Sequence, residues 1–283
     1  MNQATLTVKE NKALTPTTYR MQLAGDVSGV TAPGQFISIA LDGHFLRRPI
    51  SVCDLEPADT EGRDGTVTII YKVLGRGTEE MTHIEPGRRL DVLTGLGNGY
   101  DLSCAGDRPL LIGGGVGIPP LYLAAKRLAA TRAHGPGPEG NDGRCVNVIL
   151  GFNSADEIYY EDEFRALGCE VVIATADGSA GIKGFVTDAF RLFNTERSAE
   201  WEIDGVADEA GFTHFYTCGP GPMLRAVYEE VYEKAGVSGQ MSFEERMGCG
   251  FGACMGCSIK VKDGYKRICK DGPVLRTEEI IWQ

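Results

Sequence analysis

The chain has 283 residues, of which 42% are hydrophobic, so it has enough apolar material for real cores and a length that predicts two or three domains. Its formal net charge of −11, without a basic cluster, argues against a nucleic-acid partner. We find no leader pattern and no apolar run long enough to cross a bilayer, so we expect no membrane partner and a reducing cytoplasm for the thiols.

Short strand-like segments separated by glycine and proline fill the first hundred residues. They are Leu6–Lys9, Tyr19–Leu23, Gln35–Leu41, Val67–Val73 and Arg89–Leu93. The one helix-prone stretch of comparable strength is Thr78–Ile84. Many short strands with such turns are typical of a small closed antiparallel β-barrel, which we expect over residues 1–101.

Two stretches of this region suggest more than a barrel. Leu46–Val52 places the guanidinium of Arg48 beside a proline-stiffened strand and a hydroxyl, which suits a diphosphate and a flat ring. Gly75-Arg76-Gly77-Thr78 precedes the helix-prone stretch, and glycines at a helix N-terminus can bind an anion. The alternatives are a surface arginine and a tight turn in which Thr78 caps the helix. Their order, upstream of a dinucleotide-type segment, favours a binding function.

Three motifs taken together resemble the FAD-binding barrel of the ferredoxin–NADP reductase superfamily: Arg48-Pro49-x-Ser51, Tyr71-Lys72-Val73 and Gly77-Thr78. The resemblance implies that the arginine and the Gly-Thr pair hold the FAD diphosphate, and that the other residues line the flavin. The residues that it assigns to FAD are Arg48, Pro49, Ile50, Ser51, Tyr71, Lys72, Val73, Gly77 and Thr78.

From residue 108 onwards strands and helices alternate. A short strand (Pro109–Ile112), a glycine turn (Gly113–Pro120) and a helix (Leu121–Ala130) form the setting in which backbone N–H groups bind a pyrophosphate. Ile118 stands where G-x-G-x-x-G would have its third glycine, and the turn instead resembles the Gly-Gly-x-Gly-x-x-Pro turn of the same superfamily. The glycines that this resemblance assigns to NAD are Gly114, Gly115 and Gly117.

Further strands at Val146–Leu150, Val171–Ala174 and Phe215–Cys218 continue the rhythm, which predicts a parallel sheet flanked by helices over residues 102–236. After the last strand, Cys218-Gly219-Pro220 resembles the superfamily turn beside the nicotinamide. The resemblance assigns these three residues to the cofactor and places Cys218 near the hydride path. A buried structural thiol is the alternative.

The segment after the second strand of this sheet bears on the choice of nicotinamide cofactor. No basic residue lies between Gly151 and Phe164, where a 2′-phosphate would need one, and acids such as Glu157 and Glu161 stand there instead. The sequence therefore predicts NADH rather than NADPH. A solvated acidic helix face is the alternative, and both interpretations can hold together.

Four cysteines near the C-terminus follow the spacing C-x4-C-x2-C…C, which is that of a plant-type [2Fe–2S] site. They are Cys249, Cys254, Cys257 and Cys269. Glycines between them allow the sharp bends that a loop around so small a cluster needs. The alternative is a structural zinc site, although zinc usually takes two short Cys pairs. We expect a small cluster domain over residues 237–283, stabilised largely by its metal.

These sites together predict an electron carrier. NADH gives two electrons as a hydride and a [2Fe–2S] cluster accepts one at a time, and a flavin can do both. We find no pocket signature for an organic substrate and no base–nucleophile set, which indicates that the final acceptor or donor is another polypeptide. The expected fold is thus multi-domain β plus α/β: an FAD barrel, a parallel NAD sheet and a small [2Fe–2S] domain.

This order of parts resembles the electron-transfer subunits of NAD-dependent (class 1B) dihydroorotate dehydrogenase over essentially the whole chain. Leu46–Val52, Asp177–Thr187 and the cysteine loop carry most of the resemblance. It implies FAD between NAD and the cluster, and an FMN-containing catalytic partner that oxidises dihydroorotate to orotate for pyrimidine synthesis, two of each subunit in a heterotetramer. Ala176, where the family usually has an acid, and two insertion-like ranges, 134–143 and 196–211, depart from the pattern.

Two other functions stay open at this point. One is a related NAD(P)H-linked diaphorase subunit that serves ferredoxin, sulfite reductase or a hydrogenase. The other is a non-catalytic interaction module stabilised by zinc. An iron, zinc and flavin count would separate the second from the electron carrier, and activity with ferredoxin alone would indicate the first.

Overall fold

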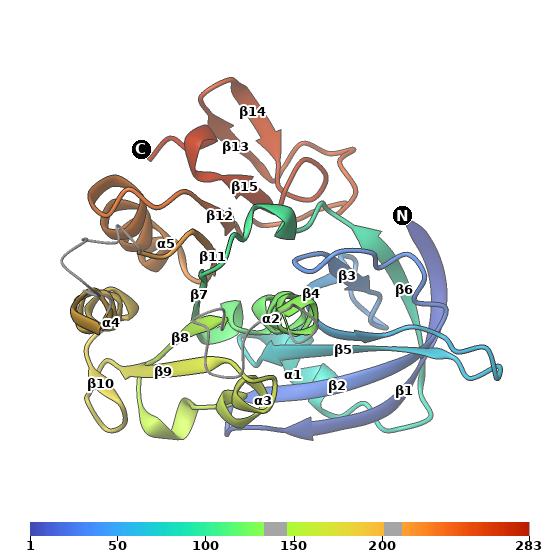
Figure 1. Cartoon of the computed structure of the whole chain (residues 1–283). Helices are drawn as coiled ribbons and strands as arrows, with labels where there is room; N and C mark the ends of the chain where they lie inside the picture. Colours follow the sequence, from blue (N-terminus) through green and yellow to red (C-terminus); the bar gives the residue numbers. More distant parts are fainter. Residues whose placement is uncertain (133–145, 201–210, 283) are drawn as a thin grey trace.

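The computed structural model describes residues 1–132, 146–200 and 211–282 of the chain. Within them the chain forms a six-stranded closed barrel, a seven-stranded sheet flanked by helices and a two-stranded hairpin near the C-terminus (Figure 1). The expected fold class, with an antiparallel barrel, a parallel α/β sheet and a small C-terminal unit, is therefore confirmed.

The barrel is built from antiparallel strands in the order β1-β2-β5-β4-β3-β6. The strands are β1 (Asn2–Ala13), β2 (Thr18–Gly25), β3 (Phe36–Ile39), β4 (Arg48–Glu56), β5 (Gly65–Lys72) and β6 (Arg89–Leu96), and helix α1 (Arg76–Thr82) follows β5. Successive side chains on a strand point to opposite faces. In β6, accordingly, Leu90 and Val92 enter the barrel core and Arg89 and Asp91 remain outside it.

The sheet has the strand order β10-β9-β8-β7-β11-β12-β15, and all neighbours are parallel except β12 and β15. Its strands are β7 (Pro109–Gly114), β8 (Asn147–Phe152), β9 (Glu170–Thr175), β10 (Ile182–Lys183), β11 (His214–Cys218), β12 (Gly239–Ser242) and β15 (Val274–Arg276). The chain builds outward from β7 on one side and then returns to add β11 on the other. The carboxyl ends of β7 and β11 therefore meet at a topological switch point, where sheets of this kind bind ligands.

Helices cover both faces of the sheet (Figure 1). They are α2 (Pro119–Arg132), α3 (Glu161–Ala166), α4 (Val186–Glu200) and α5 (Gly221–Val227), which a π-helical stretch (Tyr228–Lys234) continues. Single turns of 3-10 helix lie at Leu102–Cys104, Gly115–Gly117, Ala155–Glu157 and Thr277–Glu279. In β7, Leu111 packs toward α2 and Ile112 toward α4, so the continuous apolar run reflects burial on both faces.

The segment 237–283, expected as a small cluster domain, is joined to the sheet, because its strands β12 and β15 extend that sheet. Between these two strands lie the four cysteines and the hairpin of β13 (Ser258–Val261) and β14 (Gly264–Arg267). Buried residues of this segment, Cys257 and Ile268, share one apolar cluster with Phe36 and Leu96 on the outer face of the barrel. The division at 101 and 236 stays a prediction.

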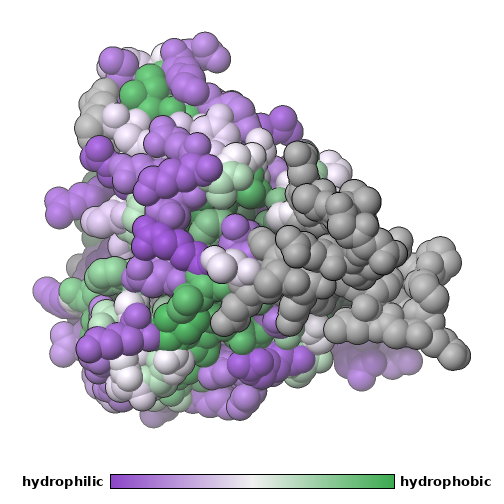
Figure 2. All heavy atoms as spheres, turned by 60° about the vertical axis from the view of Figure 1, so that its left-hand side comes forward, coloured by the Kyte–Doolittle hydropathy of each residue, from purple (hydrophilic) through white to green (hydrophobic). Residues whose placement is uncertain are grey.

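Both insertion-like ranges fall largely beyond what the structure describes. Range 134–143 lies outside the described residues, and so do residues 201–210. Residues 196–200, expected in a surface excursion, instead complete α4. Figure 2 shows the helix-bearing left-hand side of Figure 1 as mainly hydrophilic, with smaller hydrophobic areas between. No helix of the described segments combines the length and the apolar character that a membrane span requires.

Candidate functional site

Arg48 and Gly77, which the sequence assigned to one diphosphate, lie in contact. Arg48 begins β4, Gly77 lies in the first turn of α1, and a Cβ on Gly77 would overlap the guanidinium. Thr78 turns its hydroxyl back to the loop before the helix, where it accepts hydrogen bonds from the N–H of Leu74 at 3.0 Å and Gly75 at 3.3 Å. The structure thus brings Arg48 and Gly77 together and uses the Thr78 side chain as a cap.

His44 is a neighbour of Arg48 that sequence reasoning left without a function. Arg48 Nη2 donates to His44 Nδ1 at 2.6 Å, and Nη1 donates to the carbonyl of Leu46, also at 2.6 Å. The other ring nitrogen, Nε2, lies 2.7 Å from Glu80 Oε2. Hydrogen bonds from Arg76 and then from His44 lower the pKa of Glu80. The only sequence signal for this contact was the short loop that joins His44 to Arg48.

The three residues after Arg48 divide between the two faces of β4. Ile50 packs partly on the barrel core, whereas Pro49 and Ser51 have the opposite register and lie opposite Ser38 and Phe36 of β3. All three are half-buried. Pro49 and Ser51 therefore present an outer edge of the barrel that could line a flat ring, and Ile50 contributes its backbone to that edge.

The Tyr71–Val73 segment does not lie on one face either. Tyr71 is buried in the barrel core, where its hydroxyl donates to Asn11 Oδ1 at 2.9 Å. Lys72 points outward and forms a 2.9 Å ion pair with Glu157. That hydrogen bond lowers the pKa of Glu157. The alternation of side chains along a strand explains the difference between Tyr71 and Lys72. Val73 follows the end of β5, and its N–H donates to the Thr17 carbonyl at 2.8 Å.

The glycine turn after β7 and the turn after β11 meet at the switch point. A Cβ on Gly117 would overlap the carbonyl of Cys218, and a Cβ on Gly114 would overlap the sulfur of Met223. Gly219 lies against the same Met223 side chain. The sequence-predicted residues of the two turns are thus neighbours, and glycine at each position is what lets the backbones approach.

Gly115 and Pro220 complete this group. Gly115 has a φ of +53° and accepts a 2.7 Å hydrogen bond on its carbonyl from Tyr159. The ring of Pro220 comes within 3.8 Å of the Cβ position of Gly114. Burial raises the pKa of the Cys218 thiol to about 12, so this group is neutral at physiological pH. A neutral thiol in this place can line a nicotinamide site without adding charge.

Two turns at the carboxyl ends of β8 and β9 are joined by hydrogen bonds. Asp177 Oδ1 accepts from Ser179 Oγ at 2.6 Å, and this Oγ accepts from the N–H of Ala155 at 2.8 Å. Asp156 lies in the first of these turns. Since Lys72 compensates Glu157, the carboxylates of Asp156 and Asp177 supply the negative charge here. They support the preference for NADH, which stays a prediction.

The cysteine loop curls its backbone N–H groups toward sulfur. Cys249 Sγ accepts hydrogen bonds from Ala253 N at 3.2 Å and Cys254 N at 3.4 Å, and Cys257 Sγ accepts one from Cys269 N at 3.4 Å. Gly250 and Gly252 have φ of +78° and +92°, which side chains other than glycine rarely adopt. This is the cradle that thiolate ligands of a cluster need.

The thiols differ in their electrostatic surroundings. Burial opposes ionisation of Cys249, but hydrogen bonds from the backbone of Cys254 and Phe251 outweigh it and lower the pKa of Cys249 to about 6. Burial, and then the neighbouring Cys257, raise the pKa of Cys269 to about 12. Bound iron would hold all four as thiolates, because metal binding displaces the thiol proton.

The contacts pair Cys249 with Cys254 and Cys257 with Cys269. Across residues 1–132, 146–200 and 211–282, no three His, Cys, Asp or Glu side chains are gathered around a point suited to one metal ion. In a [2Fe–2S] centre each iron takes two thiolates, and four cysteines on a glycine-rich loop whose backbone N–H groups face sulfur suit such a centre. The donor set therefore fits the iron–sulfur alternative.

The cysteine loop lies one strand away from the barrel edge formed by Pro49 and Ser51. Ser38 of β3 is 3.8 Å from the Cβ position of Gly250, and on its other side Ser38 is paired with Pro49 of β4. Neighbouring strands are about 4.8 Å apart. The edge formed by Pro49 and Ser51 and the loop that carries the cysteines are therefore separated by a single strand.

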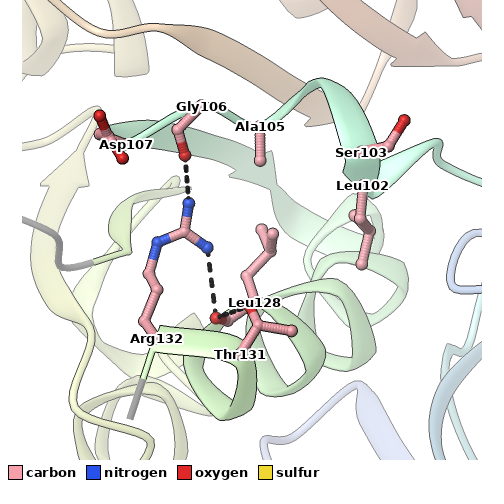
Figure 3. A pocket seen from close by; sticks show the side chains of 8 residues that line it. All are labelled: Leu102, Ser103, Ala105, Gly106, Asp107, Leu128, Thr131 and Arg132. Carbon is pink, nitrogen blue, oxygen red and sulfur yellow. Dashed lines mark hydrogen bonds between the residues drawn. The ribbon is translucent and has the colours of Figure 1, made fainter. Parts of the chain in front are cut away.

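A shallow cavity of about 250 Å³ lies elsewhere, between the loop at Leu102–Asp107 and the end of α2 (Figure 3). Arg132 crosses it and donates hydrogen bonds to the carbonyls of Gly106, at 2.5 Å, and Leu128, at 3.2 Å. This cavity is at the amino edge of the sheet, opposite the switch point, and contains none of the sequence-predicted residues. Ligands of such sheets bind at the carboxyl edge.

Comparison with known proteins identifies the two C-terminal parts of the chain and its overall fold. Residues 244–281 match the family described as the iron–sulfur cluster binding domain of dihydroorotate dehydrogenase B, and residues 111–229 match the oxidoreductase NAD-binding domain. Among solved structures, an NADH-dependent reduced ferredoxin–NADP oxidoreductase is 29% identical with a TM-score of 0.77, covering 99% of this chain and 90% of that one. A ferredoxin–NADP⁺ reductase from Neisseria gonorrhoeae, 16% identical, shares the fold with a TM-score of 0.63 over 82% of this chain and 92% of its own.

Two curated relatives match almost the whole chain. The dihydroorotate dehydrogenase B (NAD(+)) electron transfer subunit of Fusobacterium nucleatum is 41% identical, covering 97% of this chain and 96% of that protein. The protein of the same description from Geobacillus sp. is 38% identical, covering 99% of both chains. This chain belongs to the family of electron-transfer subunits of NAD-dependent dihydroorotate dehydrogenase B.

Proposed function

We propose that this chain accepts electrons from NADH, or returns them to NAD⁺, and exchanges them one at a time with an FMN-containing catalytic subunit that oxidises dihydroorotate to orotate. The chain is the NAD-linked oxidoreductase subunit of a complex, and its cofactors are FAD and a [2Fe–2S] cluster, with NAD as substrate. When bound, FAD supplies the conversion between hydride transfer and single-electron transfer. The residues of the chain hold the three groups in line.

The observation that carries this proposal is the spatial order of the three proposed sites in the fold. The Gly117–Cys218 contact marks the nicotinamide end, the Pro49–Ser51 edge lies on the barrel, and the cysteine loop follows beyond β3. We propose that Arg48 and Gly77 hold the FAD diphosphate and that Cys249, Cys254, Cys257 and Cys269 hold the cluster. The thiol of Cys218 lines the nicotinamide and exchanges no proton, because it is neutral.

We place the contact with the partner on the outer side of the cysteine loop. Cys257 and Cys269 are buried toward the barrel, whereas Cys254 is exposed between Phe251 and Met255, whose side chains are 44% and 55% exposed. Exposed apolar side chains around a redox centre suit a docking surface. The proposed assembly contains two copies of each subunit. The eight described cysteines form no disulfide, which supports a reducing, cytoplasmic location.

Co-purification with the catalytic subunit tests this function. We expect a complex that contains FMN, FAD and iron and produces NADH from dihydroorotate and NAD⁺. Reduction of ferredoxin by the chain alone, without such a partner, would instead identify a diaphorase. A colourless protein that contains zinc and no iron or flavin after anaerobic purification would exclude an electron-transfer function.

A further inference from the structure

His44 lies between two charged residues in the loop that joins β3 to β4. Its Nδ1 is 2.6 Å from Arg48 Nη2, and its Nε2 is 2.7 Å from Glu80 Oε2. The ring is largely covered, since its side chain is only 11% exposed. Glu80 is held from its other oxygen by Arg76 Nε at 2.8 Å. A row of contacts therefore runs from α1 through His44 to Arg48.

The chemistry of these groups determines which nitrogen of the His44 ring carries the proton. A guanidinium has five N–H donors and no acceptor, so His44 Nδ1 must carry the lone pair. The ring proton then sits on Nε2 and is donated to Glu80. His44 is thus neutral, in one tautomer and one orientation, when it contacts Arg48. A second proton, on Nδ1, would set two donors and two positive charges against each other.

We propose that His44 is a positioning residue for the flavin: held by Glu80, it orients the Arg48 guanidinium so that its remaining N–H groups face the FAD diphosphate. This inference rests on the proposed function of Arg48. The contacts with His44 and the Leu46 carbonyl occupy two donors of the guanidinium, and among the described residues the others have no hydrogen-bond acceptor. A side chain fixed before binding loses less conformational entropy when the diphosphate arrives.

Two charged groups face His44, and the others nearby are engaged elsewhere. The two are Arg48 from β4 and Glu80 from α1, with Arg76 behind Glu80. In the same loop Arg47 pairs with Asp91, and Asp42 pairs with Arg88. Arg48 and Glu80 are therefore the partners that fix the orientation of the ring.

The test measures FAD dissociation from the purified full-length protein by the recovery of free-flavin fluorescence. His44→Leu should weaken FAD binding about tenfold, the loss of one charge-assisted hydrogen bond. His44→Gln should stay within about threefold of the parent, because its amide can accept from Arg48 and donate to Glu80. Rescue by glutamine is not expected if the ring only fills space. His83→Leu, at an exposed histidine just past α1, is the matched control.

Arg48→Ala, measured in parallel, separates this inference from the proposed function. If Arg48→Ala loosens FAD and His44→Leu leaves the affinity unchanged, the positioning function of His44 is wrong and that of Arg48 stands. If Arg48→Ala leaves FAD in place, both fail. Should His44→Leu not fold, Glu80→Ala decides, because it removes the acceptor that holds His44 Nε2. Weaker FAD binding in Glu80→Ala supports the inference, and parental binding overturns it.

Discussion

At the residue scale, two glycines allow close contacts at the proposed nucleotide sites. The Arg48 guanidinium lies against Gly77, and the Cys218 carbonyl lies against Gly117. Both contacts are so close that a Cβ on the glycine would overlap the neighbouring atoms. Neither contact depends on a positive φ, since neither glycine adopts one. The requirement is therefore for close approach, and even a single methyl group should separate the paired parts.

Gly77→Ala should displace Arg48 and weaken FAD binding by about 1.5–3 kcal/mol, the range for a lost hydrogen bond to a charged group. Gly75→Ala is the matched control, because Gly75 has an extended backbone and a Cβ there meets nothing within 4 Å. FAD retention after gel filtration and fluorescence titration measure both. Equal retention in the two variants would contradict the contact as a binding element.

Gly117→Ala should push the two turns of the switch point apart and raise KM for NADH, with kcat less affected, because the added methyl group distorts the binding surface. Gly211→Ala, at the amino end of β11 with open space around it, is the control. Steady-state reduction of a dye acceptor by NADH measures both. An unchanged KM in Gly117→Ala would place the nicotinamide elsewhere.

Cys254→Ser should abolish electron delivery to the partner and leave reduction of FAD by NADH intact. The reason is that Cys254 is the exposed thiol of the cluster loop, while the Pro49–Ser51 edge proposed to line the flavin lies beyond β3. Anaerobic bleaching of the flavin by NADH, and reduction of the partner measured separately, test the two halves. Loss of flavin bleaching in a folded variant would mean that the carriers are not in this linear order.

How much of the site the sequence could predict differs from residue to residue. The four cysteines and the Arg48–Gly77 pair were predictable, because spacing and glycine carry direct chemical meaning. Tyr71 shows the limit: its motif is recognisable, yet strand alternation turns its side chain into the barrel core. His44 shows the opposite case, since only the fold of its loop brings it onto Arg48.

At the scale of elements, strands with clear alternation were predicted and elements formed by tertiary packing were not. Helix α4 was missed although Val186, Ala189, Phe190 and Phe193 recur at helical spacing and are buried together. Strand β12 reads Gly-Gln-Met-Ser, which has little β-propensity, and forms because β11 and β15 flank it in a buried sheet. Such a strand follows from the sheet around it rather than from its own residues.

Glu230 connects α4 with the helix after α5, and its substitution should lower stability in a pH-dependent way. Hydrogen bonds from Arg191 and then Lys234 lower the pKa of Glu230 from 4.5 to about 2. A depressed carboxyl pKa stabilises the fold above the unfolded pKa, and this contribution is lost as the pH falls from about 4.5 toward 2. Glu230→Gln should therefore cost about 1 kcal/mol near neutral pH, because Arg191 is half-exposed and solvent screens the pair.

Urea unfolding at several pH values measures this cost. The difference between Glu230→Gln and the parent should shrink below about pH 4.5, as Glu230 takes up its proton. Glu229→Gln, on the same helix and in a more exposed pair with Arg225, is the control and should change stability less. A difference that stays constant down to the lowest accessible pH would rule out the ionic origin.

At the scale of the whole molecule, the function depends on how the parts are held together. Lys72 and Glu157 join the barrel to the sheet, and Lys126 of α2 pairs with Asp54 of β4 at 2.8 Å. The cysteine-bearing segment is held by a different contact, at Asn98 just after β6. Sequence patterns do not report such long-range pairs, because the partners are 72 to 176 residues apart and follow no local rule.

Asn98 binds the backbone that follows Cys269. Its amide nitrogen Nδ2 donates to the Val274 carbonyl at 2.7 Å, its Oδ1 accepts from Val274 N at 3.0 Å, and its own N–H donates to the Gly272 carbonyl at 2.6 Å. Asn98→Ala removes these side-chain bonds and a longer one from Nδ2 to the Asp271 carbonyl, at 3.4 Å. Polar backbone groups are then left unpaired, which costs about 1–3 kcal/mol. The cluster segment should then sit less firmly on the barrel, and electron transfer from the flavin to the cluster should slow.

Rapid mixing of the NADH-reduced protein, followed by flavin absorbance and by the electron-paramagnetic signal of the reduced cluster, separates the two steps. We expect flavin reduction at the parental rate, because the Gly117–Cys218 contact and the Pro49–Ser51 edge are untouched, and delayed appearance of the cluster signal. Asn98→Asp keeps the acceptor for Val274 N and should fall between the parent and Asn98→Ala. If the cluster signal in Asn98→Ala rises as fast as in the parent, the barrel–cluster contact does not limit this step.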